Sequence, residues 1–423
     1  MRNFQKSICT FLCGAMLCGC VGNGGMETSS QSSASLQNSI ADSHGADAMA
    51  SEDELNHLYS FSWNLFNQVR EDKEGGLVSP LSALFALGMA ANGANGETLN
   101  QMEKALNLSV DQINALSRSA LHSAAEDETR TLEIANSIWV NQKYTNSLID
   151  SYSRLLKSEY DAQDFVLDFS PDQGQEQIDQ WVAKKTHNMI DKMPAHLSSD
   201  TVMVLINALA FNSAWAQAYE AGDISRGPFT NVDGSTSQVE FLNSTEKELV
   251  AAEGFKGFIK PYESRRYGLA VLVPEEDRPL DEVLAEADGA KLLNALRTPQ
   301  SATVHASFPE YTFASEMLLN EALEAMGMEL PFSEKADFSK MVEGGNVAIS
   351  EVLQKAKIEV SRSGTKAAAV TEVIVNETAA MESPDEVNIV CDWPFLYLLM
   401  DLDTATPVFM GTIQSMEPST QEN

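Results

Sequence analysis

The sequence predicts a mixed α+β protein, with helices dominating the early chain and strands the late chain. Apolar residues recur at helical spacing in Leu55–Val69. Thr201–Phe211 is a continuous apolar run, typical of a strand buried on both faces. Two strongly apolar strands, Phe395–Met400 and Val408–Ile413, lie near the end. Because no internal repeat or second linker interrupts the chain, we expect one domain over residues 52–418.

The elements of this domain are predicted in order along the chain. A helix begins near Glu52, and Ser79-Pro80 supplies a cap and a first-turn proline for a second, largely apolar helix. Further helices are expected at Gln175–Met189 and Ser315–Met326. The remaining strands are Leu132–Val140, Leu269–Val273, Ala302–Phe308, Ile349–Val352 and Ile358–Val360.

The N-terminus has the pattern of an export signal. Arg2 and Lys6 precede an apolar run, Ile8–Gly19, which is too short to span a bilayer. The run ends in Leu17-Cys18-Gly19-Cys20, which resembles a bacterial lipoprotein processing site. That resemblance implies cleavage before Cys20, acylation of its sulfur and anchoring in the bacterial cell envelope, on the periplasmic or the cell-surface side. An ordinary cleaved signal is the alternative.

The flanking segments and the cysteines follow from this interpretation. Residues 1–19 form the signal peptide, 20–51 a Gly/Ser-rich tether and 419–423 a tail. Three of the five cysteines, Cys9, Cys13 and Cys18, lie in the signal peptide, so the mature chain retains only Cys20 and Cys391. A disulfide framework and a cysteine-based metal site are therefore excluded.

The charge balance excludes several classes of partner. The 423 residues include 61 acidic and 28 basic side chains, for a net charge of −33. Phosphate backbones and anionic membranes attract clustered Lys and Arg, and no such cluster is present. We expect no nucleic-acid partner and no membrane contact other than the lipid anchor.

Enzyme signatures are absent from the sequence. It contains no Gly-x-Ser-x-Gly, no phosphate-binding glycine-rich loop and no His-Glu-x-x-His motif. The six histidines never fall at metal-ligand spacing with one another or with cysteine. We therefore expect no catalytic site, no metal and no cofactor.

The most unusual stretch begins at Ser363 and Gly364. Gly364 is a flexible pivot, and a run of small residues after it ends in the β-formers Val373-Ile374-Val375. The residues that share one face of an extended chain are Thr365, Ala367, Ala369, Thr371, Val373 and Val375. This is a strand pattern, although no hairpin turn closes it.

The stretch resembles the reactive-loop hinge of the serpins, a family of serine protease inhibitors. The motif residues, here called the hinge segment, are Arg362, Gly364, Thr365, Lys366, Ala367, Ala368, Ala369, Val370 and Thr371. Other parts of residues 52–418 resemble the family in the same order. They are Ser79–Ser82, Gly93–Thr98, Ile206–Ala208 with Phe211 and Trp215, Ala336–Ser339, Ile349–Val352, Pro394-Phe395 and Phe409–Gly411.

The resemblance implies the serpin fold, with three β-sheets, eight to nine helices and an exposed reactive-centre loop. It also implies a monomer that acts as a suicide substrate. A serine protease cleaves the loop and is held as an acyl-enzyme while the loop inserts into the central sheet. Trp215 is implied to lie where the loop enters the sheet. The native state is then a metastable, kinetically trapped state.

The chain departs from the family pattern at the hinge. Arg362 and Lys366 stand where the family has acids, and Phe308-Pro309-Glu310-Tyr311 replaces a motif that usually contains a lysine. We therefore predict that Arg362 pairs with Glu310 in a charge-reversed bridge. Two further departures are Asn212-Ser213 before Trp215, and Gln354 in place of a frequent histidine.

Family spacing places the cleaved bond between Thr378 and Ala379. The segment is longer than usual, so Ala380, Met381 and Glu382 are alternatives. Val375–Ser383 contains no Lys or Arg, which disfavours trypsin-like targets. Its small residues favour elastase-like or subtilisin-like proteases, with papain-like cysteine proteases and a Glu-specific protease as further alternatives. A non-inhibitory serpin-fold binding protein is the competing function, and the small residues Ala367–Ala369 argue against it.

Overall fold

The computed structural model describes residues 50–70, 76–126, 131–169, 171–193, 197–344, 347–365 and 386–418. Within these ranges the chain forms nine α-helices and sixteen β-strands, an α+β fold as predicted. The helices are α2 (Glu52–Val69), α3 (Pro80–Gly93), α4 (Gly96–Leu106), α5 (Val110–Glu126), α6 (Asp150–Tyr160), α7 (Pro171–Lys185), α8 (Leu280–Glu286), α9 (Gly289–Ala295) and α10 (Asn320–Ala325).

Local chemistry explains where the first two helices begin. Ser51 caps α2 in a capping box, because its hydroxyl accepts from the Glu54 N–H and its own N–H donates to the Glu54 carboxylate at 2.7 Å. Ser79 caps α3, and Pro80 occupies its first turn as predicted. Almost every residue of α3 is buried, which agrees with its apolar sequence.

A seven-stranded sheet, here called the long sheet, has the strand order β3-β2-β4-β12-β13-β5, with β11 also paired to β12. Its strands are β2 (Leu132–Asn141), β3 (Gln163–Leu167), β4 (Met203–Phe211), β5 (Ser213–Ala214), β11 (Tyr311–Leu318), β12 (Ile349–Ser361) and β13 (Gly364–Thr365). All nine residues of β4 are buried, as predicted for its unbroken apolar run.

The remaining strands form a second hydrogen-bonded network in the order β1-β16-β15-β9-β8-β7-β10-β14, with β6 also paired to β7. They are β1 (Gly76–Val78), β6 (Ile224–Thr230), β7 (Thr236–Ala252), β8 (Phe255–Pro261), β9 (Tyr267–Pro274), β10 (Gln300–Pro309), β14 (Glu386–Val390), β15 (Phe395–Asp401) and β16 (Pro407–Ile413). The seventeen-residue β7 pairs with β6, β10 and β8. Strand β7 therefore joins β6, β8 and β10 into one hydrogen-bonded network.

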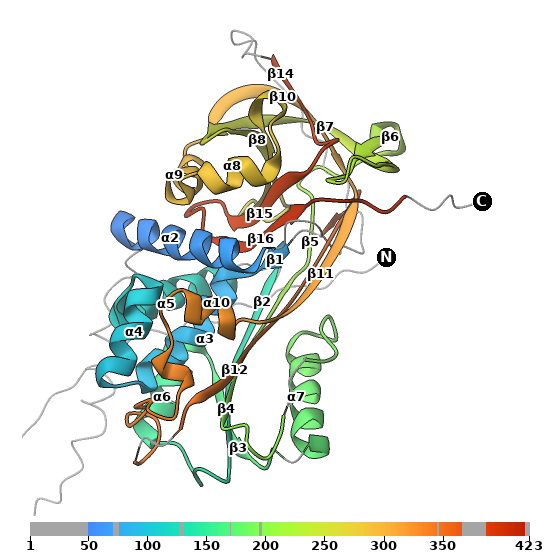
Figure 1. Cartoon of the computed structure of the whole chain (residues 1–423). Coiled ribbons are helices and arrows are strands. Elements are labelled where there is room, and N and C mark those ends of the chain that lie inside the picture. The colour runs from blue at the N-terminus through green and yellow to red at the C-terminus, as the bar shows by residue number, and fades with distance from the viewer. Residues whose placement is uncertain are drawn as a thin grey trace, which may run out of the picture. The chain divides into compact units, whose positions relative to one another are not determined.

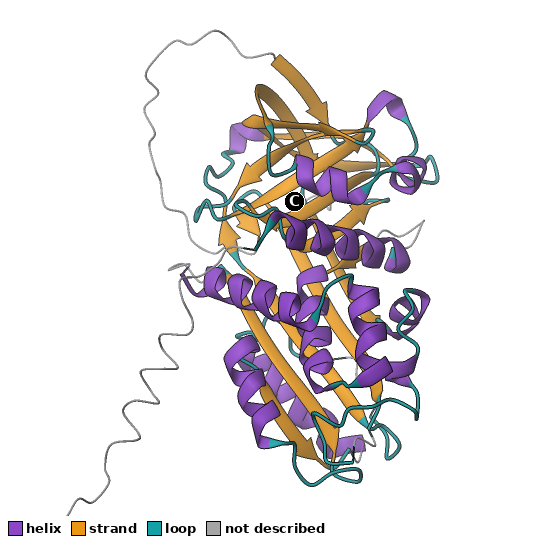
Figure 2. Cartoon of the chain, turned by 90° about the vertical axis from the view of Figure 1, so that its left-hand side faces the viewer, coloured by secondary structure: helices purple, strands orange, loops and turns teal. Residues whose placement is uncertain are grey.

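The helices divide unequally between the two faces of the long sheet. Helix α7 lies alone on one face in Figure 1, whereas α3, α5 and α6 lie on the other. Figure 2 views the molecule from the side of this larger group of helices, with the long strands running behind them. The aromatic side chains of Trp139, Phe165 and Trp181 join α7 to β2 and β3, with Trp139 and Phe165 stacked at 4.0 Å between ring centroids.

Two predictions of secondary structure were wrong. The helix expected at Ser315–Met326 is strand β11 as far as Leu318, followed by the short helix α10. Pairing along the whole of β11 with β12 overrides its local helical preference. The two strands predicted at Ile349–Val352 and Ile358–Val360 are parts of the single strand β12, because the polar residues between them continue the same pairing.

Candidate functional site

The centre of the long sheet is paired along only part of its length. Strands β4 and β12 run parallel and pair from Met203 with Ile349 to Ala208 with Lys355. Beyond these residues, Leu209–Phe211 of β4 has no β12 partner, and the upper part of β12 turns to a different neighbour. The space between β4 and β12 is here called the slot. Its lower end, at Met203 and Ile349, is closed by this pairing, and its upper end, at Phe211 and Val360, is open. Direct pairing over the lower part also means that no further strand lies between them there.

The first residues of the hinge segment occupy the upper end of this slot. Gly364 and Thr365 form β13, which pairs antiparallel with Ser361 and Val360 of β12. The other edge of β13 pairs with Ser213 and Ala214 of β5. Two residues of the predicted hinge are therefore already part of the sheet.

Thr365 faces the protein interior. Its side chain is 2% exposed, and its hydroxyl lies 2.7 Å from the hydroxyl of the fully buried Tyr262. Tyr262 in turn stacks on the Trp215 ring at 4.4 Å between centroids. Because side chains alternate along a strand, the odd-numbered face assigned to the core from sequence begins here as a buried face.

Gly364 is required by both space and backbone angle. Its φ is +138°, a conformation that side-chain-bearing residues rarely adopt. A Cβ at this position would lie 2.3 Å from the Ser213 carbonyl oxygen and 2.7 Å from the Ala214 Cα. The close approach of β5 to β13 depends on the absence of that atom.

Trp215 and Tyr219 hold the turn that joins β12 to β13. The Trp215 indole donates to the Ser361 carbonyl at 2.8 Å, and its backbone N–H donates to Ser363 at 3.3 Å. The Tyr219 backbone N–H donates to the Arg362 carbonyl at 3.1 Å. Trp215 therefore lies at the upper end of the slot, the position that the sequence resemblance implied.

Arg362 lies on the outer side of this turn, beside two carboxylates. Its backbone N–H donates to Glu310 Oε1 at 2.6 Å, and its guanidinium Nη2 donates to Glu310 Oε2 at 3.1 Å and to Glu240 Oε2 at 2.7 Å. Hydrogen bonding to Glu310 raises the pKa of the Arg362 guanidinium. The structure thus brings together the two residues of the hypothesised bridge and adds Glu240.

Below β13 the slot contains a small cavity of about 20 Å³. One wall is the end of β4 that pairs with β2 but not with β12, and the other is the upper part of β12. The chain that follows α7 covers the cavity. The lining residues are Met189, Ile190, Leu209, Ala210, Phe211, Lys357, Glu359 and Thr365. This volume is roughly that of a single water molecule, so β4 and β12 must separate before another strand fits.

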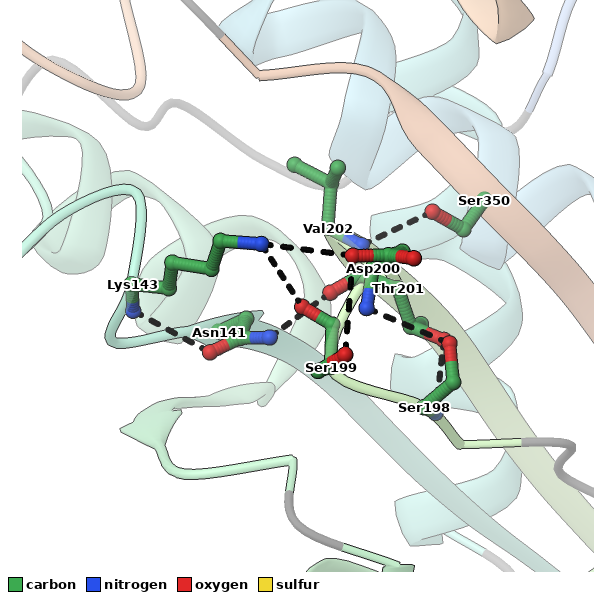
Figure 3. Close-up of polar contacts among 8 residues, drawn as sticks. All are labelled: Asn141, Lys143, Ser198, Ser199, Asp200, Thr201, Val202 and Ser350. Atoms are coloured by element: carbon green, nitrogen blue, oxygen red, sulfur yellow. Dashed lines mark hydrogen bonds and ion pairs between the residues drawn. The ribbon is translucent and has the colours of Figure 1, made fainter.

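Polar contacts close the lower end of the slot. The Val202 N–H, just before β4, donates to the Ser350 hydroxyl of β12 at 2.9 Å. Figure 3 shows this contact beside a cluster in which Lys143 reaches the Ser199 carbonyl at 3.2 Å and Asp200 at 3.3 Å. Separating β4 from β12 along their full length would break the Val202–Ser350 bond.

Gln354 links the middle of the slot to α3. Its side chain is buried, accepting from the Ser79 N–H at 2.7 Å and donating to the Ser79 carbonyl at 2.8 Å. The amide therefore satisfies both backbone groups of one residue, which a histidine ring cannot do in the same way.

Several residues predicted for the site lie outside the described residues. They are the hinge residues Lys366, Ala367, Ala368, Ala369, Val370 and Thr371, the reactive-bond residues Thr378, Ala379, Ala380, Met381 and Glu382, and the lipidation residue Cys20.

Sequence reasoning also missed part of the site. Tyr219, Tyr262, Lys260 and Glu246 were not singled out, although all four are buried around Trp215. A signal for Lys260 was available, because it interrupts the apolar run Phe258-Ile259 just before Pro261.

Among the described residues, no group of three or more His, Cys, Asp or Glu side chains is arranged to hold a metal ion. None of the described helices has the length and apolar character needed to cross a membrane.

Comparison with known proteins identifies this architecture. The family model "Serpin (serine protease inhibitor)" matches residues 56–416. A serpin-like protein of Thermococcus kodakarensis, TK1782, is 28% identical over 367 residues, covering 85% of each chain. Human Serpin B4 is 25% identical over 383 residues, covering 84% of this chain and 97% of its own.

Solved structures agree. The thermophilic serpin tengpin in its native state has a TM-score of 0.78 and 35% identity, covering 88% of this chain and 96% of its own. Thyroxine-binding globulin, solved in complex with thyroxine, shares the fold at a TM-score of 0.73 and 22% identity, covering 86% of this chain and 99% of its own. Serpins are generally protease inhibitors, and some members do not inhibit. With its slot, its glycine pivot and the match over nearly the whole described chain, this protein belongs to the serpin family.

Proposed function

We propose that this protein inhibits proteases as a suicide substrate, and that the reactive bond lies between Thr378 and Ala379. The observation that carries the proposal is the placement of Gly364 and Thr365 between β12 and β5, with Thr365 buried. Gly364 and Thr365 already form the start of a strand, β13. Insertion of the rest of the reactive loop would only lengthen β13 and would not have to begin a new strand.

The register of β13 supports the position of the bond. Thr365 pairs with Val360, so each further residue of the loop would pair one residue lower on β12. Continued in this way, Asn376 would meet Ile349, the first residue of β12. A loop cleaved after Thr378 is then just long enough to fill the slot. At about 3.3 Å per residue, insertion beside the thirteen residues of β12 would carry the attached protease roughly 40 Å.

The covalent step is that of an ordinary serine protease. The protease serine Oγ attacks the Thr378 carbonyl, the C–N bond to Ala379 breaks, and the serine proton passes through the catalytic histidine to the new Ala379 amino group. The product is an ester between Thr378 and the protease. Loop insertion then competes with hydrolysis of that ester by water.

The proposed targets are elastase-like or subtilisin-like enzymes. Val375–Ser383 contains no Lys or Arg, and Thr378, Ala379 and Ala380 fit shallow apolar specificity pockets. A papain-like protease, which would form a thioester, is the cross-class alternative.

Incubation with an elastase and a subtilisin, followed by denaturing electrophoresis, tests the proposal. We expect an adduct heavier than the inhibitor, and sequencing of the released fragment should begin at Ala379. Thr365→Arg should abolish the adduct and leave cleavage intact, because a guanidinium does not fit beside Tyr262. Glu386→Arg, which adds the same side chain at an exposed position of β14, is the matched control and should retain the adduct. Cleavage of the unmodified protein without any adduct would contradict inhibition and favour the alternative of a non-inhibitory binding protein.

We further propose that the mature protein is a monomer anchored to the bacterial cell envelope through lipidated Cys20. The support is the Leu17-Cys18-Gly19-Cys20 sequence after a short apolar run. In the native bacterial host, metabolic labelling with a palmitate analogue should mark the protein that carries Cys20 and fail to mark Cys20→Ala. Labelling of both proteins, or of neither, would exclude the anchor at this residue.

A further inference from the structure

A buried ion pair lies directly beneath the residues that hold the β12–β13 turn. Lys260, near the end of β8, has a side chain only 3% exposed, and its Nζ lies 3.0 Å from Oε1 of Glu246 on β7, whose side chain is 9% exposed. Its neighbours Phe258 and Ile259 are buried apolar residues. Replacing a buried ion pair by apolar side chains is often neutral or stabilising, so stability alone does not explain this pair.

The Lys260 ammonium faces two aromatic rings. Its Nζ lies 4.4 Å from the centroid of Tyr219 and 5.5 Å from that of Trp215. Glu246 also reaches Tyr219 through a third residue, since Ser244 donates to Glu246 at 2.6 Å and lies 3.2 Å from the Tyr219 hydroxyl. A desolvated cation over an aromatic face orients that ring, because the ring quadrupole attracts positive charge.

Trp215 and Tyr219 are also the residues that bind three successive carbonyls of the turn. Ser361 accepts from the Trp215 indole, Arg362 from the Tyr219 N–H and Ser363 from the Trp215 N–H. The turn delivers Gly364 and Thr365 into the slot. A continuous set of contacts therefore joins the buried cation to the start of β13.

We propose that Lys260, held by Glu246, is a positioning residue for loop insertion. It fixes Trp215 and Tyr219 so that their donors keep the turn, and with it β13, in register with β12. This inference rests on the proposed inhibitory function. Without the cation the aromatic pair is free to shift, β13 leaves its register, and insertion slows relative to hydrolysis of the acyl-enzyme. More inhibitor is then cleaved for each protease trapped.

The test uses the full-length protein with Lys260→Met and Glu246→Gln combined, which removes both charges and leaves neither buried alone. Lys260→Arg keeps a cation over the rings, and Tyr219→Leu keeps the backbone donor but removes one ring. Each variant is assayed for the stoichiometry of elastase inhibition, its Tm, and amide hydrogen exchange at Trp215 and Tyr219. The matched control is Arg70→Met with Asp281→Asn, which neutralises the 2.8 Å ion pair between the ends of α2 and α8.

We expect the Lys260/Glu246 double variant and Tyr219→Leu to need about tenfold more inhibitor per protease, the order expected for losing desolvated cation–π contacts. Exchange at the Trp215 and Tyr219 amides should be faster in both, whereas Lys260→Arg and the Arg70/Asp281 control should match the unmodified protein. Unchanged stoichiometry and exchange in the Lys260/Glu246 double variant would overturn the proposal and leave the pair a packing feature.

The exchange measurement separates this inference from the proposed function. If the unmodified protein forms no adduct with any protease, inhibition is refuted, yet exchange still decides whether Lys260 positions the turn. Faster exchange in the Lys260/Glu246 double variant and in Tyr219→Leu, but not in Lys260→Arg or the control, supports that positioning, and equal exchange in all variants rejects it.

Discussion

Arg362 and Glu310 form a two-pronged contact across the upper end of the long sheet: the Arg362 backbone N–H and guanidinium both donate to one carboxylate. The side chain of Arg362 is half exposed and that of Glu310 is 23% exposed. Arg362 directly follows β12, and Glu310 lies between β10 and β11, so the contact joins these two parts of the chain. A charge-reversed pair can thus restrain the turn from outside while Trp215 and Tyr219 hold it from inside.

This pair predicts the outcome of a charge-reversal experiment. Glu310→Lys alone should lower the Tm, because it sets a lysine beside Arg362 and removes the acceptor of the Arg362 N–H. Combining it with Arg362→Glu should restore part of the loss, of the order of 0.2–1 kcal/mol for an exposed pair. Recovery should be incomplete, since Glu240 would then face a second carboxylate. Urea unfolding of the two single variants and the double variant measures the coupling, and simple additivity would exclude it.

Gly364→Ala should weaken the hinge. The positive φ costs a side-chain-bearing residue about 1–3 kcal/mol of strain, and the new Cβ would collide with the β5 backbone. We expect a lower urea midpoint and faster amide exchange at Thr365. Gly222→Ala is the matched control, because nothing lies within 4 Å of its Cβ position. Equal midpoints for the two variants would show that β13 does not depend on the glycine.

Gln354→Ala should destabilise the protein by about 1–3 kcal/mol, because it leaves the buried Ser79 N–H without its side-chain acceptor. The Ser79 carbonyl keeps the bond that it accepts from the Ala83 N–H at 3.1 Å. Gln354→Glu should be worse at neutral pH, because the carboxylate is buried and lacks the donor. Burial raises the pKa of such a carboxyl, so the folded state binds the proton more tightly than the unfolded state. The deficit should therefore shrink as pH falls, as the neutral acid again donates to the Ser79 carbonyl. Thermal unfolding at several pH values checks this, and a deficit that grows toward low pH would contradict it.

Cys391 should be inert to thiol reagents in the folded protein. Burial, together with the charge of Asp392, raises the pKa of its thiol well above the ordinary value, so the reactive thiolate is absent at pH 8. Labelling of this residue should appear only after denaturation, and comparison with Cys391→Ser separates its signal from that of the N-terminal cysteines. Rapid labelling of Cys391 without denaturant would show that the core around β15 opens.

The amino-acid sequence by itself predicted the α+β class and several of the main elements, because apolar periodicity and capping residues act locally. The capped start of α3, the buried run of β4 and the apolar strands near the C-terminus all follow from neighbouring residues. The pivot at Gly364 and the charge reversal at Arg362 could also be read from the chain, and the reversal pointed to Glu310 because the usual partner position carries an acid.

What only the tertiary structure decided depends on contacts between distant segments. Leu318 is in a strand because β12 pairs with it, which no local preference reveals. The half-open slot exists because β12 changes partner from β4 to β13 along its length. Lys260 acquires its partners Glu246, Trp215 and Tyr219 only when β7, β8 and the chain after β5 converge. Burial removes water from the Lys260 ammonium and so strengthens its contacts with Glu246 and the two rings. In an extended chain the same lysine would be one solvated cation among 28 basic residues. Only the folded chain therefore gives Lys260 its role.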